Sequence, residues 1–96
     1  MDYSTMNKMR FLSMKIRTLE RNIKEDKKEL FRVQTDLLSA LDPQQRYFLK
    51  RKEVSLITRI ANNTEKIKEA KAESLQIRQV MAESLQIRQV IQEVLE

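Results

Sequence analysis

The sequence of 96 residues contains no glycine, cysteine, histidine or tryptophan, and Pro43 is its only proline. Without cysteine the chain has no disulfide bonds and no thiolate nucleophile. Without histidine it lacks the commonest general base and the commonest metal ligand. It has no glycine loop for phosphate and no serine placed beside a base. We therefore predict a protein that is not an enzyme and has no catalytic, cofactor-binding or metal site.

Aromatic residues and long apolar runs are also scarce. A chain of this length with five aromatic side chains and no tryptophan cannot build a large globular core. No apolar run approaches the ~20 residues that span a bilayer, so we expect no transmembrane segment. The first fourteen residues lack the apolar stretch and cleavage site of a signal peptide. We expect a soluble, intracellular protein, cytoplasmic by default.

Good helix formers and charged residues dominate what is present. Charged residues make up 34% of the chain, a composition typical of long exposed helices and coiled coils. Residues 1–41 carry nine Lys/Arg and six Asp/Glu, residues 42–72 carry eight and four, and residues 73–96 carry two and four. The net charge of +5 therefore lies in the first two segments. This asymmetry indicates surfaces with different neighbours.

The segment around Pro43 is the one clear break in the helical pattern. Proline suits the first position of a helix and disfavours helical geometry in the residue before it, here Asp42. The Asp42 carboxylate can accept hydrogen bonds from the first free N–H groups, and Gln45 can reach back to complete a capping box. We predict a corner at residues 42–45, formed by Asp42, Pro43 and Gln45, between a first helix at 1–41 and a second at 43–96.

Apolar residues recur at alternating intervals of three and four on both sides of this corner, which predicts coiled-coil packing. Asp26 is the polar member of the first stripe. Leu38 and Leu41 widen that stripe near the corner, and Val54, Ile57 and Ala61 widen the second. We expect an all-α, antiparallel coiled-coil hairpin, with a kinked continuous helix as the alternative. The predicted helix–helix interface consists of Met9, Leu12, Ile16, Leu19, Ile23, Leu30, Val33, Leu37, Leu49, Leu56, Ile60 and Ile67.

In such a hairpin, facing residues have numbers that add up to about 84. Asp26 then faces Thr58 or Arg59. There it either fixes the register of the helices or marks a loose, hydrated part of the seam, the contact between the two apolar stripes. The first helix runs out near residue 80 of the second. The rest of the second helix would overhang and expose an apolar face that requires a partner.

The C-terminal segment contains a tandem repeat, in which residues 72–80 and 82–90 are identical. Its second copy and the tail at 91–96 would lie in the overhang. A ten-residue period is a heptad plus three, so the second copy turns the apolar stripe by ~80°. A recent duplication and an engineered extension both explain such identity. We predict that residues 72–96 form an oligomer or partner interface made by Ile77, Val80, Met81, Ile87, Ile91 and Val94.

A basic cluster follows the corner and is interleaved with Tyr47 and Phe48. One interpretation is an anion-binding patch, which would bind nucleic acid or an anionic surface. The other is a solvated face, with the two aromatic rings filling the corner against Leu37, Leu38 and Leu41. The cluster consists of Arg46, Lys50, Arg51, Lys52 and Arg59.

Together these patterns predict a non-enzymatic scaffold or adaptor that assembles proteins through its apolar stripe and its repeat. We expect protein partners, in the first place further copies of the chain. The alternative function is a basic helical module that binds nucleic acid or an anionic surface through residues 46–59.

Overall fold

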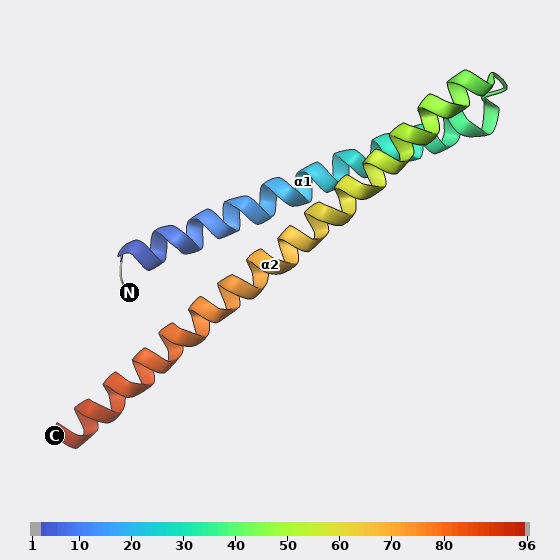
Figure 1. Ribbon diagram of the computed structural model, residues 1–96. Coiled ribbons are helices and arrows are strands. Elements are labelled where there is room, and N and C mark those ends of the chain that lie inside the picture. Colours follow the sequence, from blue (N-terminus) through green and yellow to red (C-terminus); the bar gives the residue numbers. More distant parts are fainter. Residues whose placement is uncertain (1–2, 96) are drawn as a thin grey trace.

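Two long helices form an antiparallel hairpin in the computed structural model, which describes residues 3–95. Helix α1 spans Tyr3–Ser39 and helix α2 spans Pro43–Leu95, and residues 40–42 form the corner between them (Figure 1). The molecule measures 81 × 17 × 14 Å. A straight helix of this length would extend roughly 140 Å. The predicted all-α hairpin is therefore confirmed, and the kinked continuous helix is wrong.

The two helices contact each other along a narrow seam. Every position of the predicted stripe in α1, from Met9 to Ala40, is buried or half-buried. Val33, Leu37 and Leu56 form the centre of the core, and Leu30 and Leu49 pack against them. Towards the other end, Leu12 and Ala70 are also buried. A core of this kind has a single row of side chains from each helix, as in a coiled coil.

The seam is narrower than the sequence pattern suggests. Leu38 and Leu41, expected to widen the stripe of α1, are almost fully exposed, and Val54, Ile57 and Ala61 of α2 also face solvent. The expectation that these five residues broaden the buried face is wrong for the single chain. The reason is geometrical, because one neighbouring helix covers only a narrow stripe and a wider face needs a second neighbour.

The corner is closed by the start of α2. The Asp42 carboxylate accepts a hydrogen bond from the Gln44 N–H at 3.1 Å, and the Asp42 carbonyl accepts one from the Arg46 N–H at 3.0 Å. Pro43 is the first residue of α2, as its fixed φ angle predicts. Gln45, expected to complete a capping box, makes no side-chain hydrogen bond with any residue that the structure describes, so that expectation is corrected.

Helix α2 continues well beyond the start of α1. It has 53 residues against 37 in α1, so the end of α2 projects alone from the hairpin (Figure 1). The apolar residues of this projection are exposed, from Leu85 to Leu95. We call residues 82–95 the overhang. Its length follows directly from the position of Pro43, which divides the chain unequally.

Candidate interaction surfaces

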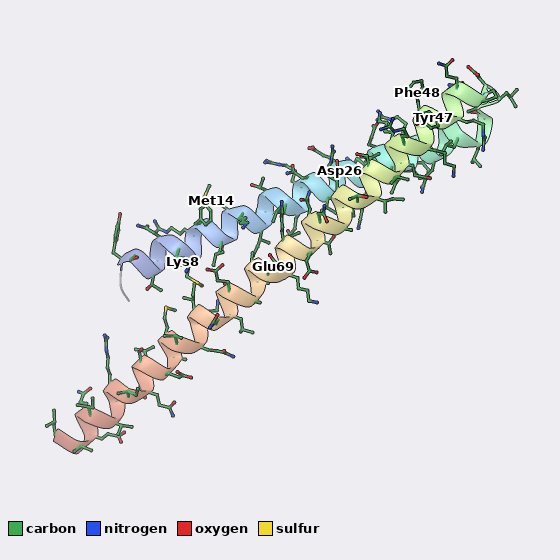
Figure 2. The ribbon with its side chains drawn as sticks, viewed as in Figure 1. Lys8, Met14, Asp26, Tyr47, Phe48 and Glu69 are labelled. Atoms are coloured by element: carbon green, nitrogen blue, oxygen red, sulfur yellow. The ribbon has the colours of Figure 1, made fainter. Side chains whose placement is uncertain are left out.

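An ion pair between Asp26 and Arg59 joins the two helices at the seam. Asp26 is only 7% exposed, whereas the Arg59 side chain is 61% exposed. The Arg59 Nε–H donates to Asp26 Oδ2 at 3.1 Å, and its Nη2 donates to Asp26 Oδ1. The guanidinium therefore binds both carboxylate oxygens, and Figure 2 shows Asp26 where the helices lie side by side. The predicted register brings these residues together as expected.

This contact holds Asp26 in its charged form. The hydrogen bond from Arg59, assisted by the opposite charge, keeps the pKa of Asp26 below its ordinary value although burial acts in the other direction. The same pair raises the pKa of Arg59. A charged, satisfied carboxylate inside an apolar seam favours the one register in which Arg59 can reach it.

Further polar contacts join the helices above and below this pair. Lys52 Nζ lies 2.7 Å from Glu29 Oε1, and their hydrogen bond lowers the pKa of Glu29. Near the open end, Lys8 Nζ lies 3.0 Å from Glu73 Oε1, with Lys8 directed towards α2 in Figure 2. All these pairs follow the predicted register within three residues. Ion pairs thus join the two helices at Lys8, Asp26 and Glu29 of α1.

Arg46 provides a contact that the sequence analysis missed. Its Nη1 donates to the carbonyl oxygens of Leu37 at 3.0 Å and Ala40 at 3.2 Å, which are free acceptors at the end of α1. Helices commonly end in glycine, but this chain has none. The arginine of α2 replaces such a cap by binding the last carbonyls of α1 directly. It therefore connects the two helices across the corner.

The predicted anion-binding patch is engaged within the chain. Arg46 caps α1, Lys52 pairs with Glu29, and Arg59 pairs with Asp26. Lys50 lies 3.5 Å from Glu53, and the Arg51 guanidinium lies 5.8 Å from the centre of the Tyr47 ring. Carboxylates thus balance the charges of Lys50, Lys52 and Arg59, whereas the partners of Arg46 and Arg51 are uncharged. The three ion pairs weaken the attraction of this surface for external anions.

The aromatic residues of the corner do not fill it. Tyr47 and Phe48 are both more than half exposed, and their rings contact each other edge-on with centroids 5.8 Å apart. Figure 2 shows both at the tip of the hairpin. The interpretation that they pack into the corner against Leu37, Leu38 and Leu41 is therefore wrong. Together with Leu38 and Leu41 they form an exposed apolar tip.

The two copies of the repeat have different environments. In the first copy, Ile77 is half-buried, and so is Met81 directly after it. Their equivalents in the second copy, Ile87 and Ile91, are more than half exposed. The ten-residue period accounts for part of this change, since it turns the stripe by ~80°. The remaining cause is that α1 begins at Tyr3 and does not extend alongside the second copy.

A groove of about 590 Å³ lies between the first turns of α1 and the part of α2 that continues past them. Ser4, Thr5 and Lys8 of α1 form one side, and residues from Glu73 to Arg88 of α2 form the other. Ile77, Val80 and Met81, all predicted interface residues, contribute to its floor. Sequence patterns alone do not reveal this groove, because it depends on where the first helix starts in space.

Burial differs between the predicted helix–helix interface and the predicted oligomer interface. Leu12, Val33, Leu37 and Leu56 are buried. The half-buried ones are Met9, Ile16, Leu19, Ile23, Leu30, Leu49, Ile60 and Ile67. Of the predicted oligomer residues, Val80, Ile87, Ile91 and Val94 are exposed. The structure thus brings the first set together within one chain and leaves most of the second set without a neighbour.

Residues 3–95 contain neither a metal site nor a membrane-spanning helix. Among the residues that the structure describes, no three carboxylates gather in a way that could hold a metal ion. Within residues 3–95 neither helix has a stretch apolar and long enough to cross a bilayer. No protein-family model, curated protein sequence or solved structure matches this chain. The function must therefore be inferred from the surfaces themselves.

Proposed function

We propose that this protein is a non-enzymatic coiled-coil scaffold or adaptor that self-associates through the C-terminal part of α2. The observation that carries the proposal is the exposed apolar stripe formed by Val80, Ile87, Ile91 and Val94. These residues repeat at intervals that place them along one side of the helix. In water such a stripe is stabilised when a second apolar helix covers it.

The contrast with the rest of the chain supports this role. Along α1, α2 has a paired seam with bordering ion pairs, such as Lys8–Glu73. The overhang carries the same kinds of residue, in part as identical sequence, but has no α1 beside it. The overhang has the apolar residues of a coiled-coil stripe but no neighbouring helix, so it is suited to pack against another helix. The exposed tip at Tyr47 and Phe48 provides further apolar surface for partners.

A pair of matched variants tests this role. Ile87 and Leu85 are both 60% exposed and lie two positions apart, on different sides of α2. We expect Ile87→Gln to lower the solution mass measured by light scattering, because it puts a polar amide into the stripe. Leu85→Gln, the control, should leave the mass unchanged. Equal effects of the two variants would contradict an interface at this stripe.

Truncation provides an independent check. A chain that ends at Val80 keeps α1 and the seam up to Ile77 but lacks the second repeat copy. We expect this chain to have the mass of one copy, and circular dichroism should still show a helical hairpin. If the shortened chain keeps the mass of the full chain, association does not depend on the overhang, and the proposal is wrong.

The basic-module function has weaker support, because three of its five basic residues are paired with carboxylates of the same chain. It makes a distinct prediction, since binding to phosphates releases counterions and weakens steeply with salt. A fluorescence titration with nucleic acid at two salt concentrations measures this directly. Salt-dependent binding that disappears on charge reversal at Lys50, Arg51 and Lys52 would favour the basic module over the scaffold.

A further inference from the structure

The overhang shows a heptad pattern that is separate from the seam. The seam of α2 runs through Ala70, Ser74, Ile77 and Met81 at intervals of four, three and four. After Ile77 a second pattern continues through the positions Val80, Ser84, Ile87, Ile91 and Val94. The step from Ser74 to Ile77 to Val80 has two intervals of three, which rotates the apolar stripe around the helix. A different face of α2 is therefore apolar beyond α1.

Charged residues border this new stripe on both sides. With Ile77, Ser84 and Ile91 at a positions and Val80, Ile87 and Val94 at d positions, Glu83 takes a g position and Arg88 takes an e position. Both side chains are exposed. Neither forms an ion pair with any residue in the described part of the chain. Their spacing of five places them on opposite flanks of one helix, so they cannot pair with each other.

The equivalent residue in the first repeat copy has its partner. Glu73 corresponds to Glu83 and pairs with Lys8 of α1 at 3.0 Å. No basic residue of α1 reaches Glu83, because α1 begins at Tyr3 and does not extend alongside this part of α2. In a parallel coiled coil, a g residue lies beside the e residue five positions later on the neighbouring chain. Arg88 of a second copy would therefore stand beside Glu83 in the way that Lys8 stands beside Glu73.

Orientation follows from these charges. In a parallel, in-register assembly every Glu83 lies beside an Arg88 of the neighbouring copy, which is favourable. In the antiparallel pair in which Val94 meets Ile77, g residues lie beside g residues and e beside e, so Glu83 lies nearest to Val90 and Arg88 nearest to Met81 of the other copy. Neither charge gains an oppositely charged partner in that arrangement. The charge pattern thus selects the parallel arrangement.

The number of chains follows from side-chain shape. Isoleucine occupies two of the three a positions, and the three d positions hold valine or isoleucine. Residues branched at Cβ at both a and d favour three or four strands over two. From these observations we propose that copies of this chain associate through residues 77–94 as a parallel, in-register coiled coil of three or four strands, with the hairpins projecting from one end. This inference rests on the proposed self-association.

Cysteine cross-linking tests the orientation, since the natural chain has no cysteine. A Val94→Cys variant is oxidised in its native state and analysed on a denaturing gel. In a parallel assembly the Val94 positions of neighbouring copies meet, so we expect disulfide-linked pairs from this variant alone. In an antiparallel assembly Val94 meets Ile77, so a link would form only when Val94→Cys is mixed with Ile77→Cys. That result would overturn the parallel arrangement.

Light scattering of the same samples separates the two proposals. A mass of three or four chains together with Val94 links supports the inference, and a mass of two chains contradicts the strand number. A mass of one chain contradicts self-association itself. As a charge control, Arg88→Glu should weaken a parallel assembly at low salt, and adding Glu83→Arg to it should restore the association. An unchanged mass for Arg88→Glu would argue against the Glu83–Arg88 contact.

Discussion

At the scale of single residues, the Asp26–Arg59 pair is the most informative contact. Its two members are unequal, because Asp26 is buried in the seam whereas most of the Arg59 side chain is exposed. Removing the arginine leaves a carboxylate without its hydrogen bonds inside an apolar contact. Removing the carboxylate leaves an arginine in water, where it needs no partner. The two substitutions should therefore have opposite consequences.

We expect Arg59→Met to lower the midpoint of urea unfolding. Asp26→Leu should raise the stability by about 1 kcal/mol or more, because it replaces a desolvated carboxylate with an apolar seam residue. Equilibrium urea unfolding followed by circular dichroism measures both. A larger loss for Asp26→Leu than for Arg59→Met would show that the pair itself is the main source of stability.

The lowered pKa of Asp26 predicts a loss of stability in acid. In the folded chain the group binds its proton only below the unfolded value of 3.8. Its contribution is therefore fully present above pH 3.8 and is lost as the pH falls through the lower, folded pKa. The Glu29 carboxylate, with its pKa lowered by Lys52, acts in the same direction.

We expect the unfolding free energy of the natural protein to fall between pH 5 and pH 2. Asp26→Asn should show a smaller fall over the same range, because position 26 no longer titrates. Urea unfolding at several pH values provides the comparison. Parallel curves for the two proteins would mean that Asp26 does not contribute to the acid sensitivity.

At the scale of elements, the corner depends on Arg46 as well as on Pro43. We expect Arg46→Ala to destabilise the hairpin by about 1 kcal/mol, because the two carbonyl groups at the end of α1 lose their donor. Hydrogen exchange should accelerate at the end of α1 while the centre of α2 stays protected. Lys50→Ala is the control, since Lys50 pairs only within α2. Equal exchange in both variants would contradict the capping role.

The sequence predicted the elements well where the signal is local. The alternation of three and four identified the buried stripe of both helices, and Asp42 and Pro43 marked the start of α2. The register also followed, because a short corner leaves little freedom in pairing, and Asp26 met Arg59 as expected. The helices and the corner depend on neighbours in sequence, and the register depends on the pairing of residues whose numbers add up to about 84.

Other features were missed because they depend on contacts distant in sequence. Nothing local distinguishes Arg46, which caps α1, from Arg51, which lies over a tyrosine ring. Val54 and Ile57 have the spacing of core residues, but their burial depends on how many helices surround α2. A sequence pattern gives the width of the apolar face of a helix but not the number of helices that pack against that face.

At the scale of the whole molecule, the unequal lengths of the helices determine the properties of the surface. Where α1 lies along α2 the two apolar stripes cover each other, and beyond the start of α1 the chain presents an uncovered apolar stripe. A parallel assembly would place all hairpin corners at one end, with the exposed tips at Tyr47 and Phe48 on separate arms. Such a shape suits a scaffold that gathers several partners.

The most direct test of this account is small-angle scattering of the full chain eluting from a sizing column, with its mass from light scattering. We predict three or four times the 11.5 kDa mass of the chain and a maximum dimension close to the 81 Å of one hairpin. An antiparallel pair joined through the overhangs would extend to roughly 130 Å. A particle of that length, or one with the mass of a single chain, would contradict the account.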